Sequence, residues 1–250
     1  MTIPAAVTDT NWLNPIELYL DRAPECKVER PIYQGDVFHS VNLPQLPNNP
    51  VEDASATINF TEGLCMVVPH PCQCYHGDNL RPRLTVAPVT SVQDYNNFKD
   101  DFSGAKDKFA LPELRIPAPD GTWKNSACVA DFGRLQTISS KWLPSAKRIA
   151  YLSHEGLGLL AKRILGFQLR YPITLANAMA YTANEWNESF LMEAWVKENK
   201  RLKGYASWLR TPIRIPGING GNPVAPYDIR SALDVLLELI TGQAIVEPAD

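Results

Sequence analysis

The first half of the chain alternates short apolar runs with turn-forming residues. The runs are rich in valine and aromatic residues and are bounded by proline, glycine, asparagine or aspartate. This pattern is typical of antiparallel strands in a small barrel or sandwich. It predicts strands over residues 33–41, 56–60, 63–68, 83–89 and 127–132.

Two segments of this half depart from the strand pattern. Asn14 precedes Pro15 and Glu17, which is the arrangement of an N-cap with a capping box, so residues 14–22 predict a short helix. Residues 94–120 carry alternating charges and then regularly spaced prolines. We expect this stretch to be a loop inserted into the strand region.

The second half has the period of helices from about residue 144. Ser153 is the expected N-cap of an amphipathic helix, whose apolar side is formed by Leu157, Leu160, Ala161, Ile164 and Leu165. A capping box of Thr182 and Glu185 opens a predicted helix over about 182–203, and residues 226–242 predict a last one. Strands first and helices second indicate the α+β class.

Composition and charge limit the classes of function. Hydrophobic residues make up 45% and charged residues 20% of the 250 residues, which excludes a disordered chain. The net charge of -3 argues against broad, sequence-independent nucleic-acid binding, although a local basic groove is compatible with it. No apolar run has the length of a membrane span, and the first residues lack the features of a signal peptide. We expect a cytoplasmic protein that does not bind membranes.

The five cysteines include a dense cluster with histidines. Four side chains in residues 70–76 are candidate zinc ligands: His70, Cys72, Cys74 and His76. On a strand they would spread over about 20 Å and could not bind one ion, whereas a looped backbone could gather three of them. The alternative is a set of buried thiols beside a solvent-facing histidine. No other cofactor is predicted.

Basic and aromatic residues mix near the end of the second predicted helix. The mixture consists of Arg201, Lys203, Tyr205, Trp208 and Arg210. It is either a contact surface for RNA or DNA or a solvated helix end.

Two fragments resemble a known family. Residues 33–38, Tyr-Gln-Gly-Asp-Val-Phe, and residues 83–91, Arg-Leu-Thr-Val-Ala-Pro-Val-Thr-Ser, are similar to the first strand and the VAPxTS strand of the PemK/MazF-like toxins. The resemblance covers about residues 31–92. It implies an SH3-like β-barrel that dimerises, cuts single-stranded RNA and pairs with an antitoxin. The chain also resembles, over most of its length, uncharacterised proteins with a GDVF-like opening and a VAPV strand.

The family's chemistry maps only in part onto this sequence. Thr90 matches the threonine or serine that acts at the scissile site, and the family also uses an arginine from an Arg-Pro pair that leads into a valine-rich strand. Here that strand carries Glu62 at its start, and the Arg-Pro pair at Arg81 lies directly before the VAPxTS strand. Arg81 or Arg83 would have to take the role of the arginine.

We therefore predict an N-terminal SH3-like antiparallel β-barrel over residues 1–143, with an inserted loop at 94–120, and a C-terminal helical region over 144–250 packed on it. The predicted function is a non-enzymatic regulatory or accessory protein that binds a protein partner, for example a nucleic-acid enzyme. The net negative charge, the displaced arginine and the added helical half favour it.

Two alternatives belong to other classes of function. One is an endoribonuclease toxin that uses Thr90 with Arg81 or Arg83. The other is a zinc-dependent binding module built on Cys72, Cys74 and His76, with His70 as a further candidate ligand.

Overall fold

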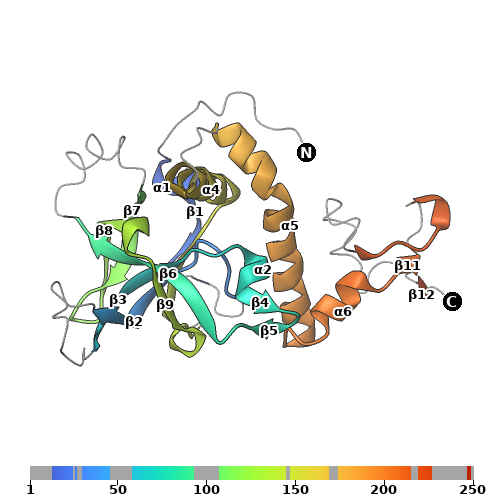
Figure 1. Cartoon of the computed structure of the whole chain (residues 1–250), viewed down its shortest axis with the longest axis horizontal. Coiled ribbons are helices and arrows are strands. Elements are labelled where there is room, and N and C mark those ends of the chain that lie inside the picture. The colour runs from blue at the N-terminus through green and yellow to red at the C-terminus, as the bar shows by residue number, and fades with distance from the viewer. Residues whose placement is uncertain are drawn as a thin grey trace, which may run out of the picture.

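A strongly curved antiparallel sheet with helices packed along one side makes up the molecule (Figure 1). The structure is a computed structural model that describes residues 13–24, 26, 30–45, 58–92, 107–144, 147–168, 174–214, 219–226 and 247–248. The predicted α+β class, a barrel followed by helices, is confirmed.

The barrel sheet consists of eight strands. Their order is β1-β10-β2-β3-β6-β8-β7, and β9 pairs with β6 beside this path. β6 thus pairs with β9 through its first half and with β8 through its last residues. The strands are β1 (Tyr19–Arg22), β2 (Val37–Gln45), β3 (Asn59–Val67), β6 (Arg83–Ser91), β7 (Lys108–Pro117), β8 (Trp123–Asp131), β9 (Gln136–Ser139) and β10 (Arg148–Leu152).

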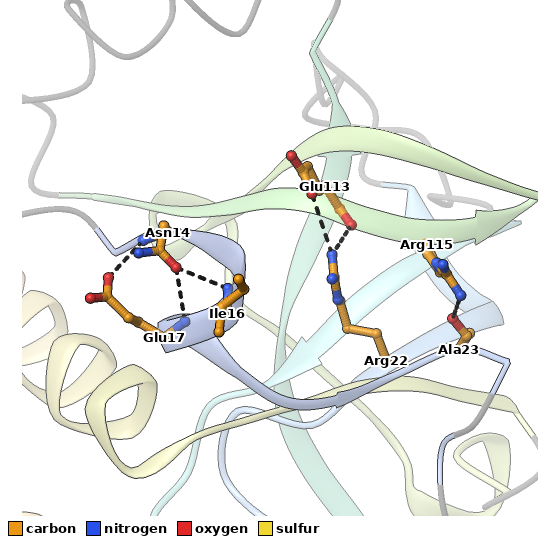
Figure 2. A network of polar contacts seen from close by, with 7 residues as sticks. All are labelled: Asn14, Ile16, Glu17, Arg22, Ala23, Glu113 and Arg115. Atoms are coloured by element: carbon orange, nitrogen blue, oxygen red, sulfur yellow. Dashed lines mark hydrogen bonds and ion pairs between the residues drawn. The ribbon is translucent and has the colours of Figure 1, made fainter.

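The two end strands of this order, β1 and β7, are joined by arginine side chains (Figure 2). Arg22 donates from Nη1 to the carbonyl oxygen of Glu113 at 2.9 Å, and Arg115 donates to the carbonyl oxygen of Ala23 at 3.2 Å. Glu113 lies at a register shift in β7 with φ of 47°. The bulge turns its carbonyl group out of the ladder, so the barrel is closed here by side chains.

Helices cover the side of the barrel where β10 leaves the sheet. They are α1 (Pro15–Leu18), α2 (Pro71–Cys74), α4 (His154–Gln168), α5 (Leu175–Asn199) and α6 (Tyr205–Arg210). Ser153 starts α4, since its hydroxyl accepts the N–H of Gly156 at 2.9 Å and donates to the carbonyl of Glu17. The predicted N-cap is confirmed. Among the helices that the structure describes, none is long and apolar enough to cross a membrane.

Short elements complete the described chain. β4 (Tyr75–His76) and β5 (Asn79–Leu80) form a hairpin, and β11 (Ile213–Arg214) pairs with β12 (Glu247–Pro248). Single turns of 3-10 helix lie at η1 (Phe132–Arg134), η2 (Ser140–Trp142) and η4 (Asn219–Gly221).

Apolar side chains from both barrel and helices form a shared core. The largest cluster joins inward-facing residues of the sheet, such as Met66 and Phe109, to Leu157 and Leu160 of α4. A second cluster fills the other part of the barrel beneath α2, and a third joins Tyr33 to α5 and α6. This sharing holds the helices in a defined place relative to the barrel.

The ion pair between Arg148 and Asp36 is completely buried in this core. The Arg148 Nε lies 3.1 Å from an Asp36 carboxylate oxygen, and both side chains have no exposed surface. The same carboxylate oxygen accepts the N–H of Tyr33 at 2.9 Å. Asp36 therefore has a structural role, and the nearby His39 bonds the hydroxyl of Ser40.

Several predicted elements have different bounds. The strands expected at 56–60 and 63–68 overlap one continuous strand, β3. The short helix expected over 14–22 ends at Leu18, and β1 begins at Tyr19. The capping box that opens it is confirmed.

Two segments expected outside the sheet are strands. Residues 108–117 of the expected loop form β7, because Phe109, Leu111 and Leu114 are buried in the core. Residues 93–106 lie outside the described residues. β10 lies between β1 and β2, so the sheet extends past the predicted boundary at residue 143.

The helix predicted to start at Thr182 starts earlier. α5 begins at Leu175, and Thr174 is its cap, accepting the N–H of Asn177 at 3.2 Å. Thr182 lies inside α5 with its hydroxyl bonded to the carbonyl of Ala178 at 3.1 Å. The predicted capping box there is wrong. The helix predicted over 226–242 lies almost wholly outside the described residues.

Candidate functional site

The short helix α2 is the element around which the candidate site forms. Pro71 occupies its first position, where a missing N–H costs nothing, and His70 caps it by accepting the N–H of Cys72 on Nδ1 at 3.3 Å. Cys74 is buried, and its carbonyl accepts the N–H of Arg81 at 2.8 Å. These contacts fix α2 to the barrel and leave its outer side facing the helices.

Two cavities meet at His70, one on each side of α2. The smaller, about 340 Å³, has an apolar wall from α4 and is lined by Gln34, Val68, Pro69, His70, Gln73, Thr85, Leu135, Ala161, Ile164, Leu165 and Gln168. The larger, about 530 Å³, is lined by His70, Pro71, Cys72, Tyr75, His76, Gly77, Arg81, Glu188, Met192, Tyr205, Ala206, Leu209 and Arg210. We call the two together the α2 groove.

The larger cavity carries more positive than negative charge. Its lining includes two arginines, Arg81 and Arg210, against one carboxylate, Glu188. Both arginines are exposed, so their guanidinium groups are available to a ligand. Burial raises the pKa of Tyr75, which keeps this wall residue neutral.

The far wall of the larger cavity is held in place by Asp78. Its carboxylate accepts the N–H groups of Gly204 at 2.5 Å and Ala206 at 2.6 Å, at the start of α6. The turn between β4 and β5 is thereby tied to α6, and this link positions Tyr205 and Arg210 opposite α2. Figure 1 shows α6 at the foot of α5, next to this hairpin.

The fold separates the basic and aromatic residues that lie close together in the sequence between 201 and 210. Tyr205 and Trp208 pack on Trp195, with ring centroids 6.1 Å and 5.4 Å from it. Arg201 and Lys203 are exposed on the turn before α6. Tyr205 and Arg210 are the members of the mixture that line the larger cavity.

The predicted zinc ligands are only partly brought together. His70, Cys72 and His76 line the same cavity, and the Nδ1 of His70 lies 3.0 Å from the Sγ of Cys72. Cys74 points away, with its thiol 3.6 Å from the carbonyl oxygen of Pro69. Within the described ranges no group of three or more His, Cys, Asp or Glu side chains has an arrangement that could hold a metal ion.

The residues predicted for a ribonuclease are not brought together. Thr90 pairs with Val129 at one end of β6, and Arg83 pairs with Ser139 at the other end. They are seven positions apart along the strand, which corresponds to about 23 Å. Arg81 lies beyond Arg83, in the wall of the α2 groove.

Sequence reasoning missed the residues that α5 contributes to the groove. Glu188 and Met192 come from a helix more than 100 residues beyond α2 in the sequence, and no local pattern links them to it. The crowding of cysteine and histidine in residues 70–76 was the local sequence signal for this site.

Comparisons with protein families and with curated proteins found no match for this chain.

Proposed function

We propose that this protein is a non-enzymatic binding protein whose α2 groove holds an acidic segment of a protein partner. The observation that carries the proposal is the charge of the larger cavity, where two arginines face one carboxylate in a chain of net charge -3. A locally positive recess in an acidic molecule selects for carboxylate-bearing ligands, because guanidinium groups bind carboxylates in a bidentate manner.

The apolar wall of the smaller cavity supports a segment rather than a single anion. The smaller cavity is bordered by Val68, Ile164 and Leu165, which can receive an aliphatic side chain. An extended partner segment would place an apolar residue against α4 and acidic residues near α6. Buried apolar anchors with charged neighbours are the usual composition of such interfaces.

The experiment is a fluorescence anisotropy titration with labelled peptides that have a leucine-rich half and an acidic half. We expect dissociation constants on the order of 10 μM at low salt and weaker binding as salt is added. Replacing the acidic half by glutamine and serine should abolish binding.

Charge-reversal variants locate the binding. Arg81→Glu and Arg210→Glu should each weaken binding by at least about tenfold, since each removes a charge-assisted hydrogen bond. Arg83→Glu is the matched control, because Arg83 is equally exposed and two residues away but does not line the groove. Equal effects of the Arg81 and Arg83 substitutions, or no binding by any acidic peptide, would overturn the proposal.

A further inference from the structure

Cys72 and His70 form a thiol–imidazole pair that the proposed binding function does not use. The Nδ1 of His70 lies 3.0 Å from the Sγ of Cys72, within hydrogen-bonding reach. The same nitrogen accepts the N–H of Cys72, so in the neutral ring it is the unprotonated nitrogen. The thiol lies closer to this nitrogen than the N–H does, at 3.0 Å against 3.3 Å, so the nitrogen is within reach of the thiol proton.

The other cysteines are less exposed than Cys72. Cys65, Cys74 and Cys128 are buried and Cys26 is half-buried, whereas Cys72 is exposed. Burial raises the pKa of Cys65 to about 12 and also raises the pKa of Cys128, which makes both thiols unreactive. Partial burial lowers the pKa of His70, so its imidazole stays neutral near pH 7 and able to take up a proton.

The cavity beside Cys72 indicates the class of reactant. It measures about 530 Å³, which is the size of a small-molecule site. Arg81 and Arg210 on its walls suit carboxylates, and Tyr205 offers an aromatic surface. A soft sulfur nucleophile next to carboxylate-binding groups fits a small disulfide that carries carboxylates.

We propose that Cys72 is a modification site that undergoes thiol–disulfide exchange with a small anionic disulfide. The Cys72 thiol passes its proton to the Nδ1 of His70, and the thiolate attacks one sulfur of the disulfide. A bond forms between that sulfur and Cys72 Sγ while the original S–S bond breaks. The departing thiolate takes the proton from His70, so one disulfide is consumed, one is formed and no further oxidant is needed.

The test uses the full-length protein and glutathione disulfide as the probe, with intact mass spectrometry as the readout. We expect one glutathione to be added per chain, at Cys72, and Cys72→Ser should lose the addition. Cystamine, a disulfide whose two ends are amines, should react more slowly, and Arg81→Gln should remove this difference while Arg83→Gln retains it.

His70→Asn tests the base without removing the helix cap. Asparagine offers an oxygen to the N–H of Cys72 but cannot take up the thiol proton. The rate constant for modification should fall about 100-fold. Circular dichroism and the urea midpoint of this variant will identify any loss of folding.

Three results would overturn the proposal. They are modification of Cys26 as fast as Cys72, a folded His70→Asn variant that reacts at the wild-type rate, and equal reaction of cystamine and glutathione disulfide. The first two concern covalent chemistry at Cys72 and do not depend on peptide binding. The third also tests the arginines that the peptide proposal uses, and the anisotropy titration of the same Arg81 variant separates the two proposals.

Discussion

The buried pair of Asp36 and Arg148 connects distant parts of the chain at a single point. Asp36 precedes β2, and Arg148 opens β10 and also donates to the carbonyl of Arg30 at 2.8 Å. Burial raises the pKa of Asp36, and the charges of Arg148 and Arg30 oppose this rise. The carboxylate is thus tolerated in the core only because its cationic neighbours are in place.

Removing one partner of this pair should be costly. Asp36→Ala and Arg148→Met should each lower the free energy of unfolding by about 3–5 kcal/mol, because each leaves a buried charge uncompensated. The double variant should lose clearly less than the sum of the two, since neither Asp36 nor Arg148 is then left buried without the other. Urea denaturation of the four proteins measures this, and additive losses would contradict it.

His39 should make stability depend on pH. Burial, and then the charge of Lys147, lower the pKa of His39 below its ordinary value of 6.5. The unfolded chain therefore takes up a proton before the folded protein does, and stability is lost as the pH falls through 6.5 and below.

The measurement is urea unfolding at pH values from about 7.5 to about 5.5. His39→Gln should flatten the decline in the free energy of unfolding over this range. Parallel curves for wild type and variant would show that His39 does not contribute to the decline.

The position of α4 depends on two glycines in its first turns, which lie in close contact with α1 and α5. A Cβ atom on Gly156 would collide with the carbonyl oxygen of Leu18, at the end of α1. A Cβ atom on Gly158 would lie 2.6 Å from the side chain of Met179 in α5. Glycine at these two positions lets α4 lie directly against both helices.

Alanine substitutions along α4 should therefore have opposite effects. Gly156→Ala should lower the free energy of unfolding by about 1–3 kcal/mol, because the backbone of α1 must shift. Gly166→Ala, near the end of the same helix with open space around it, should raise stability by up to about 1 kcal/mol. Chemical denaturation compares the two, and a loss of equal size at both sites would contradict the explanation.

The elements that the sequence predicted correctly are those with a clear local signal. Short apolar runs between turn residues identified β2, β6 and β8, and capping residues identified α1 and α4. β7 was missed because Pro112 and Pro117 resemble loop residues, although they lie at the bulge and at the strand end. β10 was missed because all five of its residues are buried and show no alternation.

The candidate site was predictable only in part. His70 and Cys72 were singled out together from their crowding, but as metal ligands, and the pairing of imidazole with thiol depends on the turn that α2 makes. Glu188 and Arg210 join them through packing of α5 and α6 on the barrel. The local spacing of residues in the sequence gives no signal for packing between elements so far apart along the chain.

For the molecule as a whole, the seam between β1 and β7 is the place where the two ends of the strand order meet without pairing as strands. The side chains of Arg22 and Arg115 bridge it in Figure 2, and the Arg22 guanidinium lies 3.8 Å from the exposed carboxylate of Glu113. An exposed ion pair at that distance adds little stability. The hydrogen bonds from the two arginines to backbone carbonyl groups therefore contribute most of the link between β1 and β7 that Figure 2 shows.

Arg115→Gln should loosen the seam without unfolding the barrel. Amide hydrogen exchange in β1 and β7 should become about tenfold faster, which corresponds to the loss of one charge-assisted hydrogen bond. Amides of β3 and β6 should keep their protection. Arg134→Gln, on the exposed turn η1, serves as the control, and a uniform acceleration in all strands would contradict the localised effect.

The position of β10 between β1 and β2 governs the order in which the barrel can form during synthesis. Tyr19 has Leu152 as its partner, so β1 leaves the ribosome on the order of ten seconds before the strand it needs. In that interval β2, β3 and β6 can pair, but β1 cannot join them. The nascent barrel must remain open until β10 emerges, and protease resistance of ribosome-bound chains should rise only after Leu152 is exposed. A rise in chains that end before β10 would contradict this order.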